Sequence, residues 1–298
     1  MMTSSTTTNN AMLEDPGETP LLPPELERHI FELTAISRPL SSLNLILVAS
    51  RVKLWVEPLL YRTMAINTRT IPGMPSCTVA EFKRIARTKS RSFLASAVRN
   101  LLVCRVKTVE TKAILSACPG VVNLYVVSYG ALFEHTDPPD RDLPLRRLYC
   151  DMMILPAAEP FTHSSFRHIT HLELFSHVDD FDPHDAAGSA WTQLGAMQNL
   201  THLAVNDGLS VALCAHLLNI CMSVRALLVL VDPEPSPPVV RQVTDDVRFV
   251  VLSVPDFVAD WQRGVLTGRD YWTRVDDFIA KRRAGEIDSD IFLLPDEN

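Results

Sequence analysis

Apolar residues recur at helical spacing near the start of the chain, at successive steps of four, four and three residues, in Leu22, Leu26, Ile30 and Leu33. This spacing places them on one side of an α-helix. Pro23 and Pro24 suit the first turn, because its backbone N–H groups have no partner within the helix. The pattern ends at Ser37, Arg38 and Pro39. One amphipathic helix is therefore predicted here.

A second apolar run follows Ser41 and Ser42, whose hydroxyl groups suit the N-cap of a helix. It extends as far as Trp55, and Pro58 ends or kinks it. Its apolar positions are Leu43, Leu47, Val48 and Val52. The two runs predict a helical hairpin, and ordinary core packing is the simplest explanation of their apolar stripes.

This hairpin resembles an F-box, and in particular the F-box-like proteins that are abundant in mushroom-forming fungi. The resemblance covers residues 22–66 and rests on Leu22-Pro23, Glu25-Leu26, Ile30-Phe31, Leu33, Leu47-Val48, Arg51-Val52 and Trp55, with the ending WVEPLLYR. In that family the module binds a Skp-type adaptor and, through it, a cullin scaffold. One departure is that the stretch from Thr34 to Ser42 lacks the acidic loop residues common in F-boxes.

The resemblance also implies which side chains do the binding. Carried over position by position, the adaptor contacts are Leu22, Pro23, Leu26, Ile30, Leu47 and Val48. Val52 and Trp55 are expected instead to hold the module together.

A six-residue pattern recurs seven times along the rest of the chain, with apolar residues at its first, fourth and sixth positions. The copies begin 23, 24, 24, 31, 24 and 23 residues apart, at Val98, Val121, Leu145, Ile169, Leu200, Val224 and Val247. Such a period is typical of leucine-rich repeats, in which short strands send alternate side chains into a stacked core. Helix-compatible segments, Thr108 to Ala117 and Leu209 to Cys221, lie between copies. We therefore predict an irregular leucine-rich-repeat-like solenoid, similar to the tails behind F-boxes in the same fungal proteins.

Strands that alternate with helices also fit a doubly wound α/β domain. Its nucleotide-binding motifs, GxGxxG and GxxxxGK[ST], do not occur, and the chain contains only ten glycines. The expected α/β fold is therefore an F-box helical module followed by a solenoid and a C-terminal helical cap. The expected boundaries are 1–19 for a disordered tail, 20–66 for the module, 67–256 for the solenoid, 257–287 for the cap and 288–298 for a second disordered tail.

The third and fifth positions of each repeat are expected to face a concave surface. Across successive copies they are Asn123, Tyr125, Arg147, Tyr149, His171, Glu173 and His202. Tyrosine and arginine are enriched where proteins bind proteins, so this surface is a candidate for target binding, with a solvated mixed face as the alternative. The aromatic, amphipathic segment 257–287 is expected to cap the open end of the solenoid, or alternatively to bind a partner.

Composition narrows the classes of partner. A formal charge of −7 without a basic run argues against nucleic acid, and no apolar stretch approaches the roughly twenty residues that span a bilayer. The first twenty residues lack the pattern of a secretory signal. The six cysteines are scattered without a paired framework, which favours reduced thiols and a cytoplasmic or nuclear protein.

Candidate chemistry is concentrated in one histidine-rich segment that contains His163, His168, His171, His177 and His184, together with aspartates from a turn-rich excursion at 179–191. No CxxC or HExxH spacing accompanies these residues, and His171 occupies the same repeat position as His202. No GxSxG motif occurs either. We therefore expect no catalytic residue, metal or cofactor.

The sequence thus favours an F-box-like substrate-recognition subunit that recruits a target protein to an SCF-type (Skp–cullin) ubiquitin ligase, and that is not itself an enzyme. One alternative is an F-box-like interaction scaffold outside a ligase. A weaker alternative is a metal-dependent hydrolase that uses the segment rich in histidine and aspartate.

Overall fold

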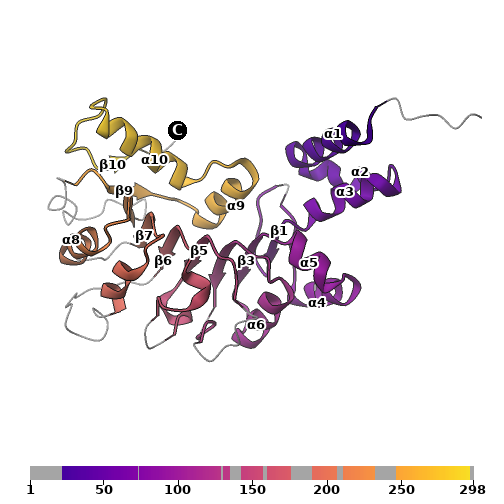
Figure 1. Cartoon of the computed structure of the whole chain (residues 1–298), viewed down its shortest axis with the longest axis horizontal. Coiled ribbons are helices and arrows are strands. Elements are labelled where there is room, and N and C mark those ends of the chain that lie inside the picture. Colours follow the sequence, from indigo (N-terminus) through magenta and orange to yellow (C-terminus); the bar gives the residue numbers. More distant parts are fainter. Residues whose placement is uncertain are drawn as a thin grey trace, which may run out of the picture.

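The computed structural model describes residues 22–72, 74–128, 130–134, 142–156, 160–175, 190–206, 211–231 and 246–295. The tail expected at 1–19 and most of the excursion at 179–191 lie outside these residues. The described chain has an α/β architecture, with a group of short helices beside one end of a parallel sheet of ten strands (Figure 1).

The helical module spans residues 24–60 and consists of α1 (Pro24–Ser37), the short 3-10 helix η1 (Pro39–Ser41), α2 (Ser42–Leu45) and α3 (Ser50–Leu60). Pro24 occupies the first turn of α1, as expected. The single second helix expected from Ser42 to Trp55 is wrong, because the chain becomes extended at Ala49. This break brings Leu45, Ile46 and Ala49 against the small core around Val52, so packing prevails over helical continuity.

The ten strands form a single sheet in the order β10-β9-β8-β7-β6-β5-β4-β3-β1-β2, and every neighbouring pair is parallel. Their bounds are β1 Thr63–Ile66, β2 Ser76–Cys77, β3 Asn100–Cys104, β4 Asn123–Val127, β5 Arg147–Cys150, β6 His171–Leu174, β7 His202–Asn206, β8 Ala226–Val231, β9 Phe249–Ser253 and β10 Leu293–Leu294. From β4 onward each strand lies beside its predecessor, whereas β2 and β3 lie on opposite sides of β1, so the strand order reverses once, at β1. A single reversal of this kind also occurs at the switch point of a doubly wound sheet. Because β1 belongs to the sheet, the module ends before the expected boundary at residue 66.

The same backbone contact recurs where successive strands begin. Each contact involves the residue directly before a strand. Its carbonyl accepts hydrogen bonds from two consecutive backbone N–H groups at the start of the neighbouring strand in the sheet. For example, Arg62 O accepts from Arg99 and Asn100, and Arg99 O accepts from Val122 and Asn123. Equivalent pairs reach the carbonyls of Val122, Arg146, Thr170 and Thr201. This recurrence is the structural counterpart of the sequence repeat.

One face of the sheet packs against α4 (Val79–Thr88), α5 (Arg91–Ala97), α6 (Thr108–Ala117), α8 (Val211–Ile220) and the 3-10 helices η3 (Met152–Ile154), η4 (Ser164–Phe166) and η5 (Gln193–Ala196) (Figure 1). The first, fourth and sixth repeat positions form this core in the six copies from Val98 to Val224, as expected. The last copy is displaced by one residue. Phe249 pairs with Leu227, which makes Phe249 and Val251 the core positions rather than Val250 and Leu252.

The other face of the sheet is covered by α9 (Phe257–Thr267) and α10 (Tyr271–Arg283) (Figure 1). Asp256 and Asp270 cap the two helices through their side chains, and Gly268 ends α9 with a φ of 74°. The expectation that these helices cap the end of a solenoid is therefore wrong. The tail expected to be disordered at 288–298 also contains β10, which pairs with β9.

Candidate protein-binding surface

The helical module exposes a large share of its apolar side chains. Nine apolar residues of the module are each between 43% and 80% exposed, and this set is called the apolar surface here: Leu22, Leu26, Ile30, Leu33, Ile36, Leu43, Leu47, Val48 and Leu54. It includes every apolar side chain of the six residues that the F-box resemblance nominates, and Pro23 is exposed as well. Exposed apolar groups concentrated in one small unit are typical of protein-interaction sites.

Different residues hold the module together. Ala35, Val52 and Val56 are buried, and Phe31 and Trp55 pack against them, as expected for Val52 and Trp55. On α1 the inward stripe is therefore Phe31 and Ala35, which leaves the neighbouring stripe of Leu26, Ile30 and Leu33 for other contacts. Ile36 and Leu54 were not nominated from the sequence. Ile36 extends this stripe by three residues, which is the signal that could have identified it.

An ion pair between α1 and α3 fixes the orientation of the helices that carry the apolar surface. Arg51 at the start of α3 donates from Nη2 and Nε to the carboxylate of Glu27 in α1, at distances of 2.7 to 3.1 Å. The hydrogen bond with Arg51 holds the pKa of Glu27 below its usual range. Ser42, expected as an N-cap, is instead buried and donates to the carbonyl of Ala35.

A second set of contacts joins the module to the sheet and its helices. The Lys89 ammonium lies 2.7 Å from Glu57 of α3 and close to the rings of Tyr61 and Phe93. Those two rings meet edge to face, with centroids 5.3 Å apart. Both charged groups are mostly shielded from water, and the hydrogen bond with Glu57 raises the pKa of Lys89. The module is therefore anchored at the end of α3.

The seven residues expected to form a concave target-binding surface lie beneath α9 and α10, so an open surface at this position is a wrong prediction. Trp261 donates to Asn123 Oδ1 at 2.9 Å, and Trp272 donates to Tyr149 Oη at 2.9 Å. The remaining contacts are Arg147 with Asp270, Tyr271 with Glu173, His202 with Asp276, and the rings of Tyr125 with Trp261 and His171 with Trp272. Their polar groups therefore serve an internal interface.

Glu173 is the buried carboxyl group of this set, and its pKa is shifted upward. Only 1% of the residue is exposed, and burial, with the neighbouring Asp260, raises the pKa of its carboxyl to about 8. The Tyr271 hydroxyl donates to Oε2 at 2.5 Å, whereas Oε1 has no hydrogen-bond partner in the described part of the chain. This arrangement suits a carboxyl group that is neutral below pH 8.

The histidine-rich segment does not form a metal site within the described residues, where no three histidine, cysteine, aspartate or glutamate residues lie together. His171 and His202 stack with centroids 4.1 Å apart, and the preceding threonine of each is hydrogen-bonded to its Nδ1. Burial, with His202 and Arg147 nearby, lowers the pKa of His171. His163 accepts from the N–H of Ser165, and His168 is exposed. His177 and His184 lie outside the described residues.

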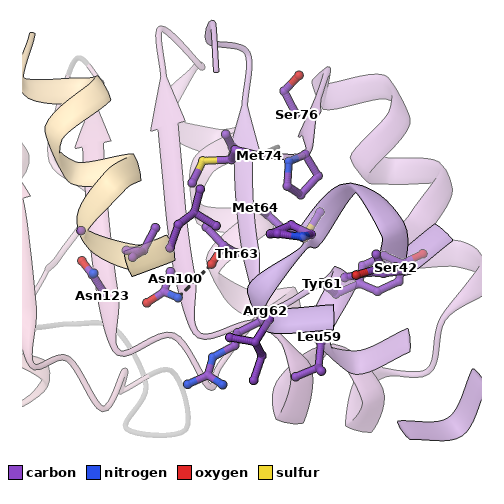
Figure 2. Close-up of a pocket in the computed structure, with 18 of the residues that line it drawn as sticks. Ser42, Leu59, Tyr61, Arg62, Thr63, Met64, Met74, Ser76, Asn100 and Asn123 are labelled. Carbon is purple, nitrogen blue, oxygen red and sulfur yellow. Dashed lines mark hydrogen bonds between the residues drawn. The ribbon is translucent and has the colours of Figure 1, made fainter. Parts of the chain in front are cut away.

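A cleft of ≈ 900 Å³ separates the helical module from the first strands and from the turn between α9 and α10. Figure 2 shows Ser42 and Leu59 on one side, Asn100 and Asn123 on the other, and Met64 and Met74 between them. The Asn100 amide donates to Thr63 Oγ1 at 3.0 Å, which fixes its orientation. The sequence did not indicate this cleft, because its walls come from segments far apart along the chain.

Comparison with protein-family models finds no match to this chain, and comparison with curated proteins finds none either. No helix among the described residues is long and apolar enough to cross a membrane. All six cysteines are free thiols, and all except the half-buried Cys77 are buried.

Proposed function

We propose that this chain is an F-box-like substrate-recognition subunit that recruits a target protein to an SCF-type ubiquitin ligase. The observation that carries the proposal is the exposure of all six residues nominated for adaptor binding, in a helical module with a separate small core. An adaptor that covered these side chains would remove from water an apolar surface that the chain itself leaves open.

We also interpret the sheet as a degenerate leucine-rich-repeat-like solenoid. Three observations support this: the repeat period in the sequence, the sequential order of strands β3 to β10, and the recurring backbone contact at successive strand starts. The solenoid would act as a rigid body that holds a target at a fixed distance from the adaptor.

Such a subunit performs no bond chemistry. It brings a lysine of the target close to a charged conjugating enzyme, so that an intermolecular step becomes effectively intramolecular. Its partners would be a Skp-type adaptor, a cullin bound through that adaptor, and a target protein.

Co-expression of the chain with a Skp-type adaptor, followed by size-exclusion chromatography, tests the proposal. We expect a stable complex with the wild type and its loss in the double variant L26D/I30D. The variant should still fold, because Leu26 is 53% exposed and Ile30 is 51% exposed. Val109→Asp is the matched control, because Val109 is apolar and 80% exposed but lies in α6, outside the helical module. No complex with folded wild-type protein would refute adaptor binding.

The first alternative is an F-box-like scaffold that binds an adaptor outside any ligase. It is favoured by the absence of acidic residues between Thr34 and Ser42. Addition of the cullin to the purified complex separates the two functions, since only the ligase subunit forms a ternary complex.

A metal-dependent hydrolase is the weaker alternative, and its aspartate-rich segment lies largely outside the described residues. Elemental analysis of the purified chain tests it. One tightly bound transition-metal ion per chain would favour the hydrolase over the receptor.

A further inference from the structure

The cleft between the helical module and the sheet is walled mainly by apolar side chains. They come from three directions: the module, strand β1 with the segment before β2, and the end of α9. Representative residues are Ile36, Leu43, Met64, Met74, Val265 and Leu266. A volume of ≈ 900 Å³ can accommodate several side chains of a bound segment.

The charge of the cleft is opposite in sign to that of the chain. Three arginines line it, Arg62, Arg146 and Arg147, and Asp270 is the only acid among the described residues that line it. Asp270 is already engaged, because Oδ2 lies 2.5 Å from Arg147 and Oδ1 accepts from the backbone and hydroxyl of Thr273. The guanidinium groups of Arg62 and Arg146 have no hydrogen-bond or ion-pair partner in the described part of the chain, and both residues are exposed. In a protein of formal charge −7, this cationic cleft would favour an acidic ligand.

Oriented amide groups lie between these charges. The Nδ2 of Asn100 is bound to Thr63, and the Oδ1 of Asn123 accepts from Trp261. These contacts leave Asn100 Oδ1 as an acceptor and Asn123 Nδ2 as a donor, without a hydrogen-bond partner among the described residues. A side-chain acceptor and a donor on adjacent strands match the donor and acceptor groups of a peptide backbone.

We propose that this cleft binds the target of the receptor, in the form of a short acidic peptide segment with a bulky apolar side chain. The carboxylates would contact Arg62 and Arg146, since guanidinium groups bind carboxylates in bidentate geometry. The apolar side chain would enter the space between Met74, Val265 and Leu266. This inference rests on the proposed function, and it replaces the covered sheet face with the cleft as the target site.

The position of the cleft fits that role. Ile36 and Leu43 line it and also belong to the exposed apolar surface of the module. A segment bound there would be adjacent to the adaptor, and the distance from target to ligase would not depend on the far end of the sheet.

A position-randomised peptide array probed with the purified full-length chain tests the proposal without an adaptor. We expect enrichment of aspartate and glutamate next to a large apolar residue. The affinity of the best peptide, measured by fluorescence anisotropy, should fall at least about tenfold in the double variant R62E/R146E. Arg225→Glu is the matched control, because Arg225 is exposed and precedes β8 as Arg62 precedes β1, but it does not line the cleft.

Three outcomes would overturn the inference: no acidic enrichment, an equal loss with Arg225→Glu, or tighter binding of a single-stranded oligonucleotide at the same arginines. The variant L26D/I30D separates this inference from the proposed function. If the variant binds the peptide but not the adaptor, the two sites are independent. If the wild type binds the peptide but not the adaptor, the cleft is a peptide-binding site and the ligase function is refuted.

Discussion

At the scale of single residues, the interface between the sheet and α9–α10 contains polar groups whose chemistry depends on burial. Glu173 is the clearest case, because its neutral form is favoured in the folded protein. The raised pKa makes its contribution to stability fully present below its ordinary value of 4.5, and this contribution is lost as the pH rises through about 8.

We therefore expect Glu173→Gln to reduce the decline in stability between pH 5 and pH 8.5, because the amide remains neutral and can still accept from Tyr271. The difference between variant and wild type at high pH should be on the order of a few kcal/mol. Urea unfolding at several pH values measures it. Glu110→Gln is the control, since Glu110 pairs with Lys83 at the surface. Parallel pH profiles for wild type and Glu173→Gln would contradict the assignment.

Trp272 tests the same interface through a neutral hydrogen bond. Replacement by Phe removes the donor to the buried Tyr149 hydroxyl, and we expect a loss of about 1–3 kcal/mol in the free energy of unfolding. Tyr149→Phe removes the other partner. Because the two groups bind each other, the double variant should be less destabilised than the sum of the single variants. Strictly additive losses in chemical denaturation would show that this hydrogen bond contributes nothing.

At the scale of elements, α9 and α10 are part of the core rather than a removable cover. Truncation after Val254 would expose Tyr125, Tyr149, Leu228 and other apolar residues of the second core, and would also remove β10. We expect the truncated chain to aggregate, as judged by solubility and size-exclusion chromatography. A chain that ends after Pro295 retains all these elements and is the control. A soluble, monomeric truncation would mean that the covered face can exist as an open surface.

The elements that the sequence predicted well are those with one dominant period. The segment Thr108–Ala117 forms α6 with the expected bounds, and six repeat copies place their first, fourth and sixth side chains in the core. The last copy was displaced because its continuous run of apolar residues, from Phe249 to Leu252, fits either register. Strand pairing with β8 decides between them.

The candidate sites also differ in how far they could be predicted from local sequence patterns. Local spacing on one helix identified Leu26 and Ile30 as one stripe, and the resemblance to an F-box implied its exposure, although the spacing alone favours core packing. The burial of Tyr149 and Glu173 could not, because their partners Trp272 and Tyr271 lie 123 and 98 residues away in the sequence. Amphipathic spacing indicated that α9 and α10 pack an apolar face against another part of the protein, but it does not specify which surface they cover.

At the scale of the whole molecule, the helical module and the sheet contact each other through few residues, and this contact would set the orientation of an adaptor relative to a target. Lys89 and Glu57 form its charged part, with 23% and 20% of their side chains exposed. Ion pairs that are partly shielded in this way are screened less by salt than fully exposed ones.

We expect Glu57→Gln to loosen this junction without unfolding the sheet. Its cost should be about 1 kcal/mol or less, and it should appear as faster amide hydrogen exchange in α3 than in β3 to β9. Glu32→Gln is the matched control, because the Glu32–Arg28 pair lies within α1 and is more exposed. Because Ile36 and Leu43 of the module line the cleft, Glu57→Gln should leave the affinity for the adaptor unchanged, weaken binding of the acidic peptide and slow ubiquitin transfer to a bound target. An unchanged transfer rate despite faster exchange in α3 would show that the orientation of the module does not limit the reaction.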